Sequence, residues 1–327
     1  MAVTGSGTQA SPYIVSSLED LQALPDLVNG GQLSEYYAEL AADIDGQFKQ
    51  AWQTFRITSR NPLYFDFKGH VIKNFIISRP SVNSVITLIA NVNHTIKNGK
   101  ILNFKTDNTV AYEQQYSPFT GGVYENMSMS FYFPRNYDSY MFSSLRKLDR
   151  CAINVLIDDY SYGSSGSVFS FYPLASDDNE FRVINCDFKI IIRNIIDAGL
   201  YGTRTVRLFT DYSVPSGAVA TKMKNCRLQG EISKLENSNL NAYPKITENI
   251  ELNNCVVSFG LPEYTGSGNV ADSWTIPATS TGIVNEDLVD DFQTYMFPIA
   301  ANMPRLSDTE IRSYSDLVAA GFDVERG

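Results

Sequence analysis

The two histidines are the first residues whose spacing suggests chemistry. His70 and His94 lie in two similar hexapeptides, at 69–74 and 93–98, and each stands four positions before an asparagine. Histidines at matching positions of a repeat could supply half of a metal site, but the sequence has no third histidine, and no acidic residue or cysteine recurs at this position. We therefore expect the two side chains to stack as a structural pair near a corner of the fold, with no bound metal or cofactor.

Carboxylates are the second candidates, because a glycosidase needs two carboxyl groups about 5 to 9.5 Å apart on one open surface. Counted from the repeated asparagines described below, the outward positions contain one acidic residue, Asp187, with Arg227 and Lys189 as neighbours. Further carboxylates fall in loops or on other faces: Asp158, Asp159, Asp177, Asp178, Asp211 and Glu231. Acidic loop pairs are usually only solvated, and the chain also lacks a Ser/His/Asp or Cys/His constellation and a phosphate-binding glycine loop. We predict that the protein is not an enzyme.

Aromatic residues form the candidate binding surface. Residues 131–142 are dense in tyrosine and phenylalanine, and further tyrosines follow on neighbouring repeats. The candidate partner or glycan surface consists of Tyr132, Tyr137, Tyr140, Tyr160, Tyr162 and Tyr172. Exposed aromatic rings present flat surfaces to sugars or to a protein partner. The alternative is that these rings point inward and build the core.

Four cysteines mark the second half of the chain. Cys151, Cys186, Cys226 and Cys255 lie too far apart in the sequence to form a Cys-x-x-Cys zinc or redox motif. We expect four reduced thiols that act as small hydrophobic core residues.

A marker residue recurs seven times and sets the positions of these side chains. The markers are Asn74, Asn98, Asn126, Arg150, Asn185, Asn225 and Asn254. The steps between them are uneven, and the longest runs from Asn185 to Asn225. Repeats of roughly 20 to 50 residues are typical of solenoids, in which each repeat packs against the next.

The residues around each marker indicate a corner. The positions two before and one after the marker are apolar in nearly every copy, as in Tyr124 and Met127 around Asn126. On one straight strand these positions face opposite sides, so both reach the core only if the chain turns at the marker. Asparagine is the non-glycine residue that best tolerates the left-handed conformation of such a corner. The six asparagines are therefore predicted to be structural corner residues, and Arg150 is the exception.

The remaining segments complete a coil. Second strands are predicted upstream of the markers at residues 84–89, 140–142, 167–171 and 206–209. A short amphipathic helix is predicted at 17–24, where Ser17 caps it and where it would cover the open first repeat. We divide the chain into an N-terminal cap with the first strands (1–60), a repeat region (61–260) and a C-terminal cap or docking segment (261–327) with two short helices.

The amino-acid composition disfavours several classes of binding partner. The net charge of −10 disfavours nucleic acid and anionic membranes as partners. No stretch approaches the roughly 18 to 20 apolar residues of a membrane span. The start of the chain lacks a basic and apolar signal peptide, so we expect synthesis and folding in a cytoplasm.

The opening third resembles a known group of proteins. Gly5-Ser6-Gly7-Thr8 with Pro12-Tyr13-Ile14-Val15, and residues 65–77 with Lys68-Gly69-His70-Val71-Ile72-Lys73-Asn74, are similar to the start of right-handed parallel β-helix proteins of phage virions and bacterial surfaces. Phe67 stands where that pattern has its first glycine, so a different turn is expected there. The resemblance implies an all-β, right-handed parallel β-helix, and it implies a trimer.

These observations lead to one expectation and two alternatives. We expect a non-enzymatic structural or attachment protein of a bacteriophage virion, as a tail spike, fibre or capsid-decorating component. Its expected partners are other virion proteins and further copies of itself, with host surface polysaccharide as a further candidate. The alternatives are a glycan-degrading enzyme on the same scaffold and a bacterial surface adhesin.

Overall fold

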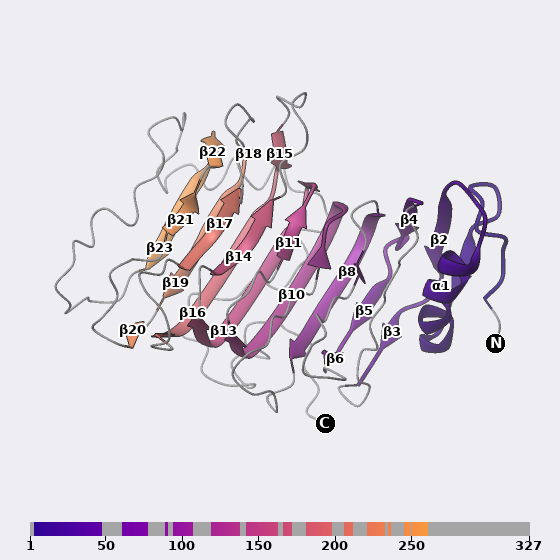
Figure 1. Ribbon diagram of the computed structural model, residues 1–327, viewed down its shortest axis with the longest axis horizontal. Coiled ribbons are helices and arrows are strands. Elements are labelled where there is room, and N and C mark those ends of the chain that lie inside the picture. The colour runs from indigo at the N-terminus through magenta and orange to yellow at the C-terminus, as the bar shows by residue number, and fades with distance from the viewer. Residues whose placement is uncertain are drawn as a thin grey trace.

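The computed structural model describes residues 3–47, 61–77, 89–90, 94–106, 119–137, 142–162, 166–171, 181–197, 206–211, 221–232, 235–236, 245–248 and 250–260. Within these ranges the chain forms one α-helix and 23 β-strands, which lie side by side along the molecule with the N-terminus at one end (Figure 1). All pairs of named strands are parallel. The prediction of an all-β, parallel fold is confirmed. The predicted C-terminal segment 261–327 lies outside the described residues.

The N-terminal end is covered by helix α1 (Leu18–Gly30). Ser17 is the N-cap, and its Oγ accepts a hydrogen bond from the backbone N of Asp20 at 3.2 Å. Leu21, Leu24 and Val28 are buried against the core, so the helix continues past Pro25, beyond the predicted end at residue 24. No helix in the described ranges has the length and apolar character needed to cross a membrane.

Most strands belong to one 17-stranded sheet, counted over the described residues. The first group comprises β1 (Tyr13–Val15), β2 (Tyr36–Leu40), β3 (Ile44–Asp45), β4 (Leu63–Asp66), β5 (Val71–Lys73), β6 (Ile76–Ile77), β8 (His94–Thr106) and β10 (Val123–Tyr137). The second comprises β12 (Lys147–Asp149), β13 (Ala152–Tyr162), β15 (Phe181–Ile184), β16 (Asp187–Asp197), β18 (Thr221–Lys224), β19 (Arg227–Ile232), β20 (Leu235–Glu236), β22 (Ile250–Asn253) and β23 (Val256–Gly260).

A six-stranded sheet is built from the segments between the markers. Its strands are β7 (Ile89–Ala90), β9 (Phe119–Thr120), β11 (Phe142–Leu145), β14 (Gly166–Phe171), β17 (Val206–Asp211) and β21 (Lys245–Glu248). The segments predicted at 167–171 and 206–209 fall within β14 and β17. The chain thus contributes in turn to both sheets, and each such pass is called a rung below.

The marker residues adopt the backbone conformation that a corner requires. All seven have positive φ, between 51° and 61°, and this includes Arg150 at 56°. The residues two before the marker are at most 3% exposed in all seven copies, and Met127, Cys151, Cys186, Cys226 and Cys255, each directly after its marker, are fully buried. Both flanking positions therefore face the core, as the pattern predicts.

The corner asparagines are linked by side-chain hydrogen bonds from rung to rung. Asn98 Nδ2 donates to Asp66 Oδ1 at 3.1 Å, and Asn126 Nδ2 donates to Asn98 Oδ1 at 3.1 Å. Farther along, Asn225 Nδ2 donates to Asn185 Oδ1 at 3.1 Å and Asn254 Nδ2 to Asn225 Oδ1 at 2.8 Å. Each amide donates toward the N-terminus, and the ladder begins on a carboxylate.

The placement of Asn74 corrects the predicted alignment. Asn74 was aligned with Asn98, but Ile72 pairs with Ile101 and Lys73 with Leu102, which places Asn74 beside Asn103. Asn74 Nδ2 donates to Asp45 Oδ1 at 3.0 Å, and Asn103 Nδ2 donates to Asn74 Oδ1 at 2.9 Å. The early rungs therefore carry a second corner ladder, which also begins on an aspartate. The two similar hexapeptides that end at Asn74 and Asn98 belong to different corners.

The resembling stretch departs from its pattern at Phe67, and Gly99 on the next rung accommodates the change. Phe67 is buried, and Lys68 and Gly69 make the turn with φ of 51° and 87°. A Cβ on Gly99 would lie 2.2 Å from the Phe67 Cβ. The glycine is needed because the larger side chain below it fills the space.

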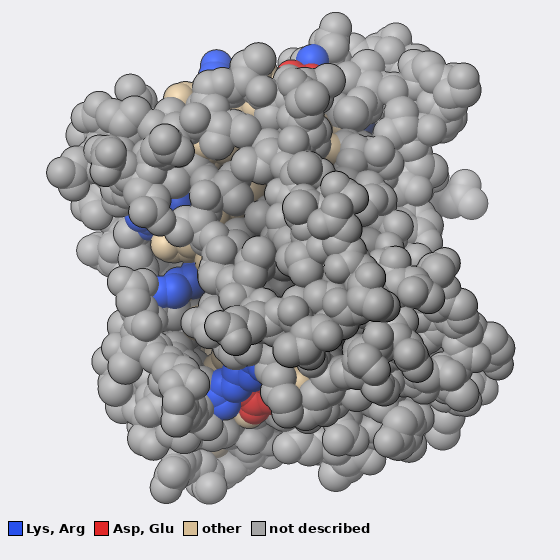
Figure 2. Space-filling model, turned by 90° about the vertical axis from the view of Figure 1, so that its left-hand side faces the viewer, with Lys and Arg blue, Asp and Glu red and all other residues tan. Residues whose placement is uncertain are grey.

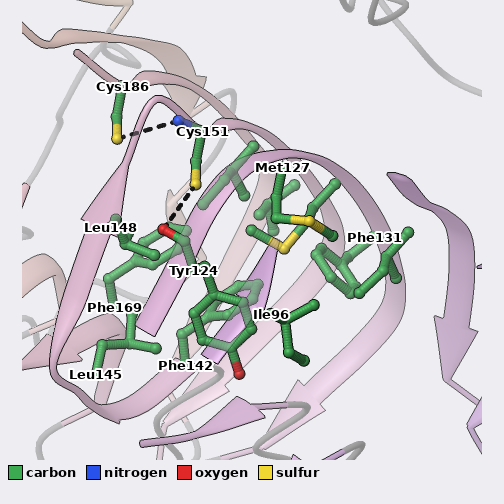
Figure 3. Packing of buried hydrophobic residues seen from close by; sticks show 14 of the residues in the cluster. Ile96, Tyr124, Met127, Phe131, Phe142, Leu145, Leu148, Cys151, Phe169 and Cys186 are labelled. Atoms are coloured by element: carbon green, nitrogen blue, oxygen red, sulfur yellow. Dashed lines mark hydrogen bonds between the residues drawn. The ribbon is translucent and has the colours of Figure 1, made fainter. Parts of the chain in front are cut away.

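The core between the two sheets is packed with aromatic and aliphatic side chains (Figure 3). Phe142, Phe169 and Phe209, on neighbouring strands of the smaller sheet, stack with ring centroids 4.4 and 5.0 Å apart and interplanar angles of 6° and 10°. The interior is thus filled by stacked side chains rather than left as a channel.

Candidate functional site

The predicted tyrosine surface is only partly brought together. Tyr132 lies on β10 and is half-buried. Tyr137 and Tyr162 end β10 and β13, but their side chains lie outside the description. Tyr140 and Tyr172 fall outside the described residues. The described part of the chain therefore supports one tyrosine of the six as a surface candidate.

Tyr160 does not belong to the predicted surface, because its side chain is fully buried in the core. Inward residues of β13 alternate at Ile153, Val155 and Ile157, and the next core residue is Tyr160, three positions later. The same interval of three separates the inward residues on either side of each marker. The alternation therefore shifts by one within β13, and this shift turns Tyr160 inward.

Tyr132 belongs to a small polar cluster that spans three rungs. Its hydroxyl donates a hydrogen bond to Asp158 Oδ2 on β13. Arg193 Nη1 on β16 lies 2.9 Å from Asp158 Oδ1. The carboxylate is thus held by a phenol on one side and a guanidinium on the other. Such a group can position a polar ligand or a partner side chain through hydrogen bonds.

Asp187, the acidic residue predicted on the outward face, lies in a buried ion pair. It is paired in register with Arg227, whose Nε donates to Asp187 Oδ1 at 3.0 Å and whose Nη2 donates to Oδ2. Both side chains are 7% exposed. Neighbouring outward positions are also buried, including Ser128, Asn154 and Lys189. This row of residues is therefore not an open surface, and the Asp187 carboxylate is engaged by a bidentate partner.

The two histidines do not form the stacked pair that was predicted. His94 pairs with Leu63, is buried, and its Nε2 lies 2.7 Å from the Tyr124 hydroxyl. His70 is partly exposed, and its Nδ1 lies 3.0 Å from Asp43 Oδ1. The prediction was wrong because it aligned the two similar hexapeptides with each other, and that alignment does not match the true register of these rungs.

The four cysteines are free and buried on four successive rungs, as predicted. The backbone N of Cys151 donates to Cys186 Sγ at 3.4 Å, and Cys151 Sγ donates to the Tyr124 carbonyl at 3.4 Å (Figure 3). Burial raises the pKa of the Cys151, Cys186 and Cys226 thiols well above the ordinary value. A hydrogen bond with Cys226 lowers the pKa of Cys255. Thiols with raised pKa values are poor nucleophiles and metal ligands.

The described ranges contain no group of three or more His, Cys, Asp and Glu side chains that could hold a metal ion. The polar groups that recur from rung to rung instead bond to their own counterparts. The arrangement can therefore hold a stack together, and the Tyr132, Asp158 and Arg193 cluster offers a local polar contact.

Two features were missed at the level of sequence. Arg193 was not connected to Asp158, because the long step between their markers, Arg150 and Asn185, hides their adjacency until the register is known. The distribution of charge was also overlooked, although the stretch before Lys49 contains seven acidic residues and no lysine or arginine. That signal was visible in the sequence.

Comparisons with known proteins add little. No protein family matches the chain. No curated protein matches it either. The chain is similar to a solved structure from Bacteroides ovatus, described as a "putative immunoglobulin A1 protease", with 14% sequence identity, a TM-score of 0.47, and coverage of 79% of this chain and 86% of that one. At this identity and TM-score the similarity says nothing about the activity of this chain.

Proposed function

We propose that this chain is a right-handed parallel β-helix that serves as a non-enzymatic structural or attachment protein in a larger, homo-oligomeric assembly. The observation that carries this proposal is that the repeated polar residues form hydrogen bonds with one another. On both sides of the Arg150 rung, corner asparagines are bonded to the asparagine of the previous rung. The repeated asparagines therefore have a structural role, which is to join each rung to its neighbour.

The outward carboxylate supports the same proposal. Asp187 would be a candidate acid or base on the rung surface, but its two oxygens face the Arg227 guanidinium and it is buried. A general acid or base must reach its substrate, and a buried carboxylate whose two oxygens are both bonded to a guanidinium is not accessible to one.

The setting that we propose is a bacteriophage virion. Its support is the resemblance of the opening third of the chain, in particular Gly5-Ser6-Gly7-Thr8 and residues 65–77, to β-helix proteins of virions. A stack of rungs suits that setting, because parallel strands pair from rung to rung throughout the described ranges.

Fractionation of native material tests the setting. Lysates of the organism that carries the gene are separated on a density gradient, and the chain is detected by mass spectrometry. We expect it in the particle fraction, together with other particle proteins. Recovery only as a free protein at the top of the gradient would contradict the virion role.

A polysaccharide assay separates attachment from glycan cleavage. The purified chain and its Asp158→Asn variant are incubated with surface polysaccharide from candidate hosts, and new reducing ends are measured. We expect none from either protein. Release of reducing ends by the wild type that is lost in Asp158→Asn would establish the enzyme instead, with Asp158 as a reacting carboxylate.

A further inference from the structure

Opposite charges are separated along the chain. Residues 3–47 hold seven acidic side chains and no lysine or arginine: Glu19, Asp20, Asp26, Glu35, Glu39, Asp43 and Asp45. Glu19, Asp26 and Glu35 are exposed and form no ion pair with the described residues. The helix α1 places Asp26 beside Leu27, the exposed large apolar side chain of the described ranges. We call residues 3–47 the acidic cap.

A basic strip lies on three later rungs. β12, β15 and β18, with the residues flanking β12, carry six cations and one anion, Asp149, which gives a net charge of 6 − 1 = +5. The basic strip consists of Arg146, Lys147, Arg150, Arg182, Lys222 and Lys224, of which Arg182 is buried. Among the described residues visible on the end of the molecule opposite the N-terminus, lysine and arginine predominate over aspartate and glutamate (Figure 2). The strip is notable because the whole chain has a net charge of −10.

The cations of the strip are close neighbours. Lys147, Arg182 and Lys222 lie on adjacent strands, because Leu148 pairs with Val183 and Val183 with Met223. The register between β15 and β18 shifts at Arg182, so that Lys222 is paired with Phe181. Like charges this close together on neighbouring strands repel one another. Arg150 approaches Asp149 at 3.2 Å and Lys222 approaches Glu251 at 3.9 Å, which offsets part of this repulsion.

Two of these cations are available to an acidic partner. Lys147 is half-buried and makes no ion pair within the described ranges. Lys224 is exposed, and its Nζ lies 5.3 Å from the centroid of the Phe181 ring, which holds the side chain in place. A fixed, exposed cation loses less conformational entropy on binding than a free one.

We infer that copies of this chain associate through the acidic cap of one copy and the basic strip of the next. The two surfaces are complementary in charge, and Leu27 supplies an apolar contact between them. A contact between two different surfaces of identical chains closes into a ring if the rotation allows it, and otherwise grows into a filament. The inference rests on the homo-oligomer of the proposed function and names its surfaces.

Sedimentation velocity at low and high ionic strength tests the inference. Because the contact joins exposed charges, we expect the full chain to associate at about 50 mM salt and to dissociate at about 500 mM, where screening acts over a few ångström. Lys147→Glu should weaken the association constant about tenfold, since it places a carboxylate opposite the cap. Lys100→Glu, the same reversal on β8 outside the strip, should leave association unchanged.

A charge swap makes the test specific. Asp26→Lys should weaken association of the chain with itself, and mixing it with Lys147→Glu should restore a heterodimer, because the reversed strip then meets the reversed cap. A monomer at every ionic strength, equal effects of Lys147→Glu and Lys100→Glu, or failure of the mixture to associate would overturn the inference. Binding of heparin by a monomeric wild type that is lost in Lys147→Glu would overturn it in favour of a polyanion site. None of these outcomes depends on the polysaccharide assay above, so each proposal can fail separately.

Discussion

At the scale of single residues, the corner position places two requirements on the residue that occupies it. A residue there must tolerate positive φ and must offer both a donor and an acceptor to its neighbours. Asn225 does both, with its Nδ2 bonded to Asn185 and its Oδ1 to Asn254. The pattern of residue types already predicts this role, since asparagine tolerates left-handed backbone. The direction of the ladder and its start on Asp66 follow only from the structure.

Two substitutions of Asn225 separate the contribution of its side-chain hydrogen bonds from that of its positive φ. Asn225→Ala removes two side-chain hydrogen bonds and puts alanine at positive φ, so we expect a loss of about 2–4 kcal/mol in the free energy of unfolding. Asn225→Gly removes the same hydrogen bonds without the backbone cost, and should lose about 1–2 kcal/mol less. Urea unfolding monitored by circular dichroism measures both. Equal losses in the two variants would show that the left-handed backbone costs nothing here.

Arg150 interrupts the ladder and offers a stabilising substitution. Asn126 Oδ1 is buried and lacks a hydrogen-bond partner in the described ranges, and Arg150 has positive φ. Arg150→Asn supplies the missing donor on a residue that tolerates this backbone better, so we expect a gain of about 1–2 kcal/mol. The urea midpoint should rise with an unchanged slope. Arg150→Gln, which is longer and tolerates positive φ less well, should give no gain; an unchanged or lower midpoint in Arg150→Asn would contradict the ladder account.

At the scale of elements, strands and corners are predicted far better than register. Apolar alternation identifies the segments that become β14 and β17, and the N-cap identifies the start of α1. Pairing depends on the length of the turns between strands, and similar hexapeptides at Asn74 and Asn98 belong to different corners. The errors at His70 and at Asn74 share this cause. Tyr160 was misplaced because its strand shifts alternation without a positive-φ residue to signal it.

The smaller sheet is held to the core by its column of phenylalanines. Phe169 stacks between Phe142 and Phe209 and is fully buried. Phe169→Ala should therefore cost about 3–5 kcal/mol, since it opens a cavity between two rings, and Phe169→Leu clearly less. Thermal unfolding with both variants gives the comparison. Similar melting temperatures for the wild type and Phe169→Ala would mean that the column does not stabilise the fold.

At the scale of the whole molecule, the buried thiols make stability depend on pH. The folded pKa values of Cys151, Cys186 and Cys226 are raised, so these thiols stay protonated in the fold while an unfolded chain loses their protons. Their contribution is complete below the unfolded thiol pKa of about 8.5 and is lost as pH rises above it, by up to about 1.4 kcal/mol per pH unit for each thiol.

Urea unfolding between about pH 7 and pH 9.5 measures this loss. Cys186→Ala removes one thiol and should make the decline with pH less steep by about one third of the cysteine contribution. An identical pH profile in the wild type and in Cys186→Ala would contradict the account. Cys255, whose pKa is lowered, is the matched site at which substitution should not flatten the decline.

Our central proposal is that the chain is a right-handed coil of parallel rungs that acts as a part of a larger assembly. Electron cryomicroscopy of the particle fraction tests it most directly, because one map reports both the hand of the coil and its neighbours. We expect right-handed rungs whose corner asparagines stack, in contact with other copies of the chain and with other particle proteins. A coil of the opposite hand, or particles that contain no density for this chain, would contradict it.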